Sequence, residues 1–434
     1  MNGKTAMSYP YKSFNRREML GSLGLGATAS LGFMMTQENA TGKNPAADVV
    51  DKGANLKITD VQMFHVGKLY VRIQTNAGIT GWGETYGLIP KAAIELCAAM
   101  GEGIKGENPT RIEHIWQDIY RGTFWRGGPV LQSALAGIDI ALWDIMGKHF
   151  DTPVHQLLGG KVRDKARVYY HVFGDTTEVL TTGIIDAKEQ GFTAVGHLTP
   201  FLDEDRDIPY FKTHADKIGD AIETVRGYRE AVGTGVDLCI EIHRRMTPTE
   251  AVQLGLGIEE FHPYFFEDPV TPDNFDEMAY VADKINIPIA TGERFSSIWE
   301  FEMALSRNAV QYIRPDVCLV GGISGARKIA ALAEARHVGV VPHNPLSPIS
   351  TAACLQIAAT APNFALQEYP IGEDVSPKID MVTGMAQHDG NGYLMISDAP
   401  GIGMELKPDA IENCPEVPRE VVTRLHADGS VIDQ

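Results

Sequence analysis

The stretch Val236-Asp-Leu-Cys-Ile-Glu-Ile242 opens a repeating pattern that decides the fold. It is followed by Tyr264-Phe-Phe-Glu267 and by Pro288-Ile-Ala-Thr291, so that these β-rich runs begin 28 and 24 residues apart. A helical pattern separates each run from the next, and this spacing is typical of one β/α unit. Eight such runs occur in the chain, at Arg167–His171, Thr193–Leu198, Val236–Ile242, Tyr264–Glu267, Pro288–Thr291, Val310–Arg314, Gly339–Pro342 and Phe364–Gln367.

Strands that alternate with helices predict a parallel sheet. Eight of them over about 200 residues predict a closed (β/α)8-type barrel in an α/β protein. The alternative is an open, doubly wound sheet, but no G-x-G-x-x-G motif follows any of the runs. We therefore assign residues 166–385 to a barrel domain.

The segments that precede and follow the barrel domain in the sequence do not show the β/α pattern. Residues 55–165 predict a small α+β domain. Its strand patterns lie at Lys57–Phe64, Leu69–Thr75 and Asn76–Glu84, and its helical patterns lie at 90–105, 110–121 and 129–149. Residues 386–434 are rich in Gly and Asp and show no β/α pattern, so we expect this tail to pack on the α+β domain.

The first 50 residues differ from the rest of the chain. Arg16 and Arg17 precede an uncharged, apolar stretch from Leu20 to Met35, which at 16 residues is shorter than a membrane span. This arrangement is typical of an export signal, and the arginine pair resembles a twin-arginine signal. The alternative is a disordered or amphipathic N-terminus with a chance arginine pair. We expect residues 1–50 to be a signal and linker that directs export, for example to the periplasm. The protein is cytoplasmic if the signal is not used.

The overall composition narrows the class of partner. Hydrophobic residues make up 44% of the chain, which is enough for a large core, and 38 Lys+Arg against 56 Asp+Glu give a net charge of −18. That charge argues against nucleic acid or an anionic membrane surface as the main partner, and we expect no stable membrane insertion of the mature chain. A small anionic substrate is compatible with it, because a bound divalent cation can reverse the local field. The five cysteines are far apart and predict neither a disulfide framework nor a zinc site.

Three glutamates end neighbouring strands of the predicted barrel. Glu241, Glu267 and Glu293 are each 26 residues apart, one β/α unit every time. Active sites of such barrels lie at the C-terminal ends of the strands, so we expect the three carboxylates to converge there. Three negative charges at one point require a cation, and ligands that are all oxygen favour Mg²⁺, or Mn²⁺, over zinc or copper.

Two histidines and two further carboxylates also lie at the ends of predicted strands. His243 lies two residues after Glu241 and would share its face of an extended strand, whereas His197 on the second strand would point the other way. His343 ends the seventh run, and Asp316 ends the sixth, where it can orient the imidazole and raise its basicity. Glu368 ends the eighth run and would complete the rim opposite the metal.

These groups together predict a reaction. A divalent metal on a substrate carboxylate lowers the cost of an enediolate, so that an imidazole can remove the α-proton near neutral pH. A second, protonated histidine could then expel a β-hydroxyl. The predicted overall reaction is therefore the dehydration of a polyhydroxy acid to a 2-keto-3-deoxy acid.

The chain resembles the enolase superfamily, mandelate racemase/muconate lactonizing enzyme subgroup, and within it the sugar-acid dehydratases that act on galactonate and mannonate. The resemblance rests on the strand-end glutamates and on three further segments: Ala134–Asp144, Arg314–Ile323 and Pro342–Pro348. It runs from Leu56 to Val431 and implies a (β/α)7β barrel under an α+β capping domain. It also implies Mg²⁺ bound by the three strand-end glutamates and a symmetric homo-oligomer.

The resemblance further implies roles for the remaining site residues. His343, paired with Asp316, would be the general base, and His243 would be the acid that expels the 3-hydroxyl. Glu368 would hydrogen-bond the substrate carboxylate or enediolate. The predicted substrate is a small sugar acid of the galactonate type, bound under lid loops near Tyr86 and Gly122–Gly128.

The sequence differs from the usual pattern of this subgroup at two positions that bear on the predicted reaction. The first metal ligand is usually Asp but is Glu241 here, one methylene longer. The second strand reads Ala194-Val-Gly-His-Leu198, without the Lys-x-Lys of racemases, which counts against a two-base racemase. The alternatives are a cycloisomerase or epimerase of a related sugar acid, or a catalytically silent sugar-acid-binding protein.

Overall fold

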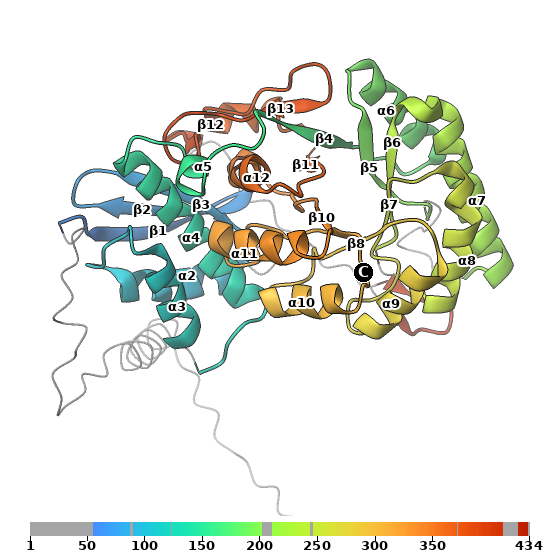
Figure 1. Ribbon diagram of the computed structural model, residues 1–434, viewed down its shortest axis with the longest axis horizontal. Coiled ribbons are helices and arrows are strands. Elements are labelled where there is room, and N and C mark those ends of the chain that lie inside the picture. The colour runs from blue at the N-terminus through green and yellow to red at the C-terminus, as the bar shows by residue number, and fades with distance from the viewer. Residues whose placement is uncertain are drawn as a thin grey trace, which may run out of the picture.

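The computed structural model describes residues 55–86, 90–122, 124–201, 211–243, 246–370, 372–410 and 424–432. These residues form a small sheet-and-helix unit beside a larger barrel (Figure 1). The export signal predicted in residues 1–50 lies outside the described residues and stays a prediction.

The smaller unit, which we call the cap, is an antiparallel sheet with the order β1-β2-β3 that is covered by helices. Its elements are β1 (Ile58–Val66), β2 (Lys68–Thr75), β3 (Thr80–Thr85), α2 (Pro90–Ile104), α3 (Ile112–Gly122) and α4 (Pro129–His149). The alternating and helical patterns upstream of residue 150 thus correspond to one element each.

Helix α4 packs between the cap sheet and the barrel. A Cβ atom on Gly83 of β3 would stand 2.0 Å from the carbonyl oxygen of Gly137, so helix and strand touch through their backbones. On the opposite side, Trp143 Nε1 donates to Ser324 Oγ at 2.9 Å, and the Ser324 N–H donates to Asp139 at 3.0 Å. Nearly all residues from Gln132 to Gly147 are buried, and a helix buried on all sides is typical of such a central position. By length and composition α4 could also cross a membrane, but 83% of its most apolar window is buried in this fold.

The barrel has eight parallel strands in the order β10-β9-β8-β7-β6-β5-β4-β11, and a parallel bridge between Val340 and Phe364 closes the ring. Its strands are β4 (Lys165–His171), β5 (Ala194–Leu198), β6 (Asp237–Glu241), β7 (Phe265–Glu267), β8 (Ile289–Thr291), β9 (Tyr312–Ile313), β10 (Gly339–Val340) and β11 (Gln367–Tyr369). The predicted (β/α)8-type barrel is confirmed. The last strand starts three residues later than its predicted run, which began at Phe364.

Helices alternate with these strands around the outside of the barrel (Figure 1). They are α6 (Thr177–Glu189), α7 (His214–Val232), α8 (Pro248–Ile258), α9 (Phe275–Lys284), α10 (Ile298–Ser306), α11 (Gly322–Glu334) and α12 (Pro348–Thr360). Many start with a side-chain cap. In α8, for example, Thr247 and Glu250 form a reciprocal capping box, which satisfies free N–H groups of the first turn.

The C-terminal segment contacts both parts of the molecule. Its strands are β12 (Val382–Thr383), β13 (Tyr393–Met395), β14 (Glu405–Leu406), β15 (Arg424–Leu425) and β16 (Val431–Ile432), and the short helix α5 (Val154–Leu157) lies between cap and barrel in the chain. Strand β13 pairs antiparallel with β4 of the barrel. The Ile402 N–H donates to Asp144 of α4 at 3.0 Å. The tail predicted to pack on the α+β domain therefore also extends the barrel sheet.

An apolar layer fills the barrel interior beneath the C-terminal strand ends. It consists of Tyr169, Ala194, Cys239, Phe265, Ala290, Val341 and Leu366, all fully buried. The polar side chains at the strand ends lie on top of this apolar layer, which shields them from water on the side of the barrel interior.

Candidate active site

The residues predicted for the site lie together at the C-terminal end of the barrel. Glu241 and Glu267 are the last residues of β6 and β7 and are register partners. Asp316 and His343 form a parallel bridge beyond β9 and β10. Glu368 lies within β11, and Glu293 follows β8 by two residues.

One group of carboxylates, of which Glu267 and Asp268 are buried and Glu293 is partly exposed, is close enough to share a cation. The nearest oxygens of Glu267, Asp268 and Glu293 all lie within 4.8 Å of one another. Neither carboxylate oxygen of Glu267 accepts a hydrogen bond from the described residues. Burial, reinforced by Glu241 and Glu293, raises the pKa of Glu267 well above its usual range despite a nearby arginine. Mutually repelling carboxylate oxygens this close together fit a bound divalent cation, since hard cations prefer ligands of this kind.

Asp268 was not predicted as part of this group. On a regular strand it would point away from its neighbour Glu267, but its φ of +43° turns the backbone and brings the carboxylate inward. Thr291 donates to Asp268 Oδ1 at 2.5 Å and holds it there.

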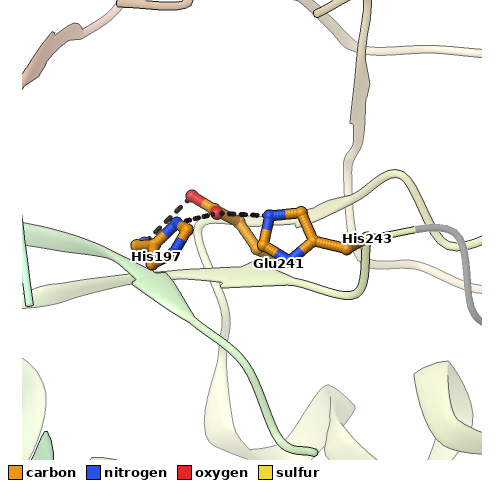
Figure 2. Close-up of side chains that lie close together, drawn as sticks. All are labelled: His197, Glu241 and His243. Carbon is orange, nitrogen blue, oxygen red and sulfur yellow. Dashed lines mark hydrogen bonds and ion pairs between the residues drawn. The ribbon is translucent and has the colours of Figure 1, made fainter. Parts of the chain in front are cut away.

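Glu241 lies in a second group, with two histidines (Figure 2). Its Oε2 is 2.8 Å from His197 Nδ1 and 3.4 Å from His243 Nε2, and its Oε1 accepts the backbone N–H of His197 at 2.9 Å. Burial opposes ionisation, but the two histidines outweigh it and lower the pKa of Glu241 well below its usual range. The three glutamates thus share one end of the barrel, but only Glu267 and Glu293 are grouped around one point.

The prediction that His197 points away from the site is wrong. Its φ of +61° places it in the left-handed region, where the alternation of a strand no longer holds. The β5–β6 register is irregular between Val195 and Leu198 for the same reason. His197 therefore turns toward Glu241 instead of outward.

His343 and Asp316 form the predicted dyad. His343 Nδ1 is 2.8 Å from Asp316 Oδ2, and its Nε2 is 3.2 Å from Glu293 Oε2. Burial lowers the pKa of His343, but Glu368, Asp316 and Glu293 together outweigh burial and raise it to about 9. Without a cation beside Glu293 the imidazole is therefore protonated near neutral pH, and Asp316 fixes its Nδ1 side. A cation held by Glu293 would offset that negative charge and lower the pKa, as a general base requires.

A buried arginine connects the two sides of the site. The Arg314 guanidinium forms ion pairs with Glu267 and with Glu368, and it also donates to the Tyr169 hydroxyl. Glu368 further contacts His171 Nε2 at 2.6 Å. Burial raises the pKa of Glu368, but Arg314 above all lowers it well below its usual range. Glu368 is thus an ionised carboxylate with a fixed orientation.

Sequence analysis missed Arg314, Tyr169 and His171. A signal for two of them was present. Arg314 precedes Asp316 by two residues and shares its face, and His171 ends the first strand as Glu241 ends the third.

Tyr169 also explains the glycine at position 196 of the second strand. A Cβ atom on Gly196 would lie 2.3 Å from the Tyr169 ring, so only glycine leaves room for that ring. The Tyr169 ring fills the space beside Gly196, and its hydroxyl accepts a hydrogen bond from the Arg314 guanidinium.

The cap holds the segment that follows His343. Glu84 of β3 accepts hydrogen bonds from Ser347 Oγ at 2.5 Å and from the Ser350 N–H at 3.1 Å, at the start of α12. Burial raises the pKa of Glu84 to about 7. The Tyr86 ring lies 6.0 Å from the His343 ring, so the cap also contributes an aromatic wall to the site.

Comparisons with known proteins agree with this geometry. Residues 49–159 match the N-terminal domain of mandelate racemase / muconate lactonizing enzymes, and residues 191–410 match the enolase C-terminal domain-like family. The chain is 36% identical over 390 residues to D-galactonate dehydratase of Xanthomonas oryzae pv. oryzae, covering 87% of this chain and 100% of that protein. The chain belongs to the mandelate racemase / muconate lactonizing enzyme family.

Solved structures of this family superpose closely on the chain. An enolase of Agrobacterium radiobacter with bound Na and L-malate gives a TM-score of 0.81 at 30% identity, covering 87% of this chain and 100% of that one. A mandelate racemase/muconate lactonizing enzyme of Jannaschia sp. CCS1 gives 0.77 at 29% identity, covering 84% and 99%. The chain is an enzyme of the hydro-lyase class in the enolase superfamily. Enzymes of this superfamily use a divalent metal, and the buried acidic group fits a metal site.

Proposed function

We propose that the protein is a Mg²⁺-dependent dehydratase of an aldonic acid of the galactonate type, which yields a 2-keto-3-deoxy acid. The observation that carries the proposal is the position of His343, buried and paired with Asp316, across the barrel end from His243. The curated relative named D-galactonate dehydratase supports this substrate class. The Agrobacterium structure adds that a family member holds L-malate, which is a 2-hydroxy acid.

The proton transfers fall to the two histidines. His343 Nε2 takes the proton from the carbon next to the substrate carboxylate, while Asp316 holds the proton on Nδ1 and so fixes the tautomer. His243 gives a proton to the departing 3-hydroxyl, which leaves as water. The substrate loses one water in total, and solvent returns the two histidines to their starting states.

Other side chains orient the substrate and hold the cation. Glu368, ionised and fixed by Arg314 and His171, would accept a hydrogen bond from a substrate hydroxyl. Glu267 and Glu293, joined by Glu241, would hold Mg²⁺, because all three offer oxygen ligands. When bound, the cation stabilises the negative charge that develops on the substrate carboxylate.

The test is a screen of the full chain against a library of aldonic and uronic acids with Mg²⁺. Formation of 2-keto-3-deoxy product is followed by semicarbazide absorbance. We expect at least one aldonic acid to react, with the signal lost in EDTA and absent in His343→Asn. Isomerised product without loss of water would contradict dehydration and indicate a cycloisomerase or epimerase. Binding of acids without any turnover would indicate a binding protein.

A further inference from the structure

The second group, His197, Glu241 and His243, offers nitrogen as well as oxygen ligands. The group of Glu267, Asp268 and Glu293 offers only oxygen, and we call it the oxygen-only group. The ligand atoms of the second group are two imidazole nitrogens and one carboxylate oxygen, all within 4.8 Å of one another (Figure 2). Two histidines and one carboxylate form a ligand set typical of zinc and of other transition-metal ions. Mg²⁺ by contrast favours oxygen ligands.

The distances suit an ion at the centre of this group. Ligand atoms bound at about 2.0–2.1 Å to a tetrahedral ion lie roughly 3.3 Å apart. The two nitrogens lie 2.8 and 3.4 Å from Glu241 Oε2, on either side of that value. The two imidazole nitrogens also lie within 4.8 Å of each other, so all three ligand atoms face one point.

The backbone holds the three side chains in this arrangement. His197 and His243 both have positive φ, of +61° and +52°, which histidine adopts only at a cost. Both turns direct an imidazole toward the same carboxylate oxygen, and the His197 N–H fixes the other oxygen at 2.9 Å. The carboxylate is buried, but the imidazoles are 31% and 28% exposed, so solvent and ions reach the site from one side.

We propose that His197, Glu241 and His243 form a binding site for a divalent transition-metal ion of the zinc class, separate from the oxygen-only group of Glu267, Asp268 and Glu293. Binding replaces the proton shared between His197 and Glu241, so the ion is taken up with release of protons. A water molecule completes the coordination. Glu241 belongs to this site in the conformation described here, so an ion at this site withdraws Glu241 from the other two glutamates. Zinc and Mg²⁺ therefore compete for one carboxylate.

One consequence rests on the proposed function. A zinc ion that occupies both His243 and Glu241 removes the proposed acid and one proposed magnesium ligand, so zinc should inhibit turnover. The binding test below uses no substrate, so its result does not depend on whether the dehydratase proposal holds.

The experiment measures metal binding to the metal-free full chain, purified without a polyhistidine tag. Zn²⁺ is titrated by calorimetry, and Co²⁺ is added as a spectroscopic probe. The wild type is compared with His197→Asn and His243→Asn, each checked for its fold by circular dichroism. His214→Asn is the matched control, because His214 is half-exposed on α7 and contacts Gln253 instead of this group.

We expect one zinc ion per chain in the wild type and in His214→Asn, and the intense visible bands of four- or five-coordinate Co²⁺ with nitrogen ligands. Loss of an outer-shell partner alone costs roughly 10–100-fold in metal affinity, so loss of a ligand should raise the Kd for zinc at least about tenfold. Saturating Mg²⁺ should weaken zinc binding in the wild type. Unchanged zinc affinity in both histidine variants would overturn the proposal. So would the weak spectrum of six-coordinate, all-oxygen Co²⁺.

Discussion

Replacing Arg314 by methionine should destabilise the protein strongly when no metal is bound. Arg314 is fully buried and forms ion pairs with Glu267 and Glu368. Glu368 keeps two other partners, His171 and the Asn344 N–H, whereas the oxygens of Glu267 accept no hydrogen bond from the described residues. The cost of the substitution therefore falls mainly on Glu267, which would be left as a buried carboxylate among other carboxylates.

The size of the effect follows from this loss. Removing one partner of a buried ion pair costs roughly 3–5 kcal/mol when the remaining charge is not compensated, and this is an upper bound here because the raised pKa of Glu267 lets it take up a proton. The structure describes roughly 350 residues, and an unfolding entropy near 2.1 cal/mol/K per residue converts that cost into a decrease of roughly 4–7 °C in Tm. Methionine fills much of the volume of the arginine stem, so a cavity adds little.

The assay is thermal unfolding of the metal-free full chain, followed by circular dichroism. Addition of Mg²⁺ should raise the Tm of Arg314→Met more than that of the wild type, since a cation can replace the missing charge; at 100 times Kd a ligand stabilises by about 2.7 kcal/mol. The double variant Arg314→Met/Glu267→Gln is the control and should recover most of the loss, because it removes both members of the pair. Equal Tm values for Arg314→Met and the wild type, or no recovery in the double variant, would refute the ion-pair argument.

Three further predictions concern proton transfer, the cap and the second strand. His343→Asn should abolish exchange of the substrate α-proton with deuterated solvent, whereas His243→Asn should allow exchange but block loss of water, both measured by NMR. Glu84 has a folded-state pKa of about 7 against 4.5, so its stabilising contribution is complete below pH 4.5 and is lost as the pH rises through 7. Relative to Glu84→Gln, the wild type should lose about 3 kcal/mol of unfolding free energy over that range. Gly196→Ala should cost roughly 1–3 kcal/mol by displacing the Tyr169 ring, measured by chemical denaturation.

Matched control variants show whether the effects at Glu84 and Gly196 are specific to those positions. Glu102→Gln removes an exposed carboxylate and should still lose stability between pH 4.5 and 7 as the wild type does. Gly219→Ala, in helix α7 with open space around it, should not destabilise. Full dehydration by both histidine variants would contradict the assigned roles. A pH profile of Glu84→Gln that parallels the wild type would show that folding does not raise the pKa of Glu84. A Gly196→Ala variant as stable as the wild type would show that the Tyr169 ring moves freely.

The barrel could be predicted from the sequence because its signal is repeated. Each β/α unit places a short apolar run and a strand-end carboxylate at the same point, so Glu241, Glu267 and Glu293 could be assigned to one edge from spacing alone. The partnership of Asp316 with His343 could be predicted in the same way, because neighbouring parallel strands bring residues of equal depth together.

Strand alternation assumes extended backbone, and three site residues do not have it. His197, His243 and Asp268 have φ values of +61°, +52° and +43°, which no pattern of residue types indicates. At His197 and Asp268 the turn moves the side chain across the plane of the sheet, whereas His243 still faces Glu241 as alternation predicts. This explains why His197 and Asp268 were misplaced or missed, while residues on regular backbone such as Glu267 were placed correctly.

The same three turns determine how Glu241 differs from the other glutamates. Because His197 turns inward, its backbone N–H and its imidazole both face the end of β6, and a longer side chain than aspartate can reach them. A shorter Asp at this position would place its carboxylate nearer the strand, and hence farther from the His197 N–H. The extra methylene of Glu241 and the unusual backbone of His197 are therefore one structural feature. Both features bring nitrogen ligands beside an oxygen-only group, which is why the proposed competition between zinc and magnesium would distinguish this site most directly.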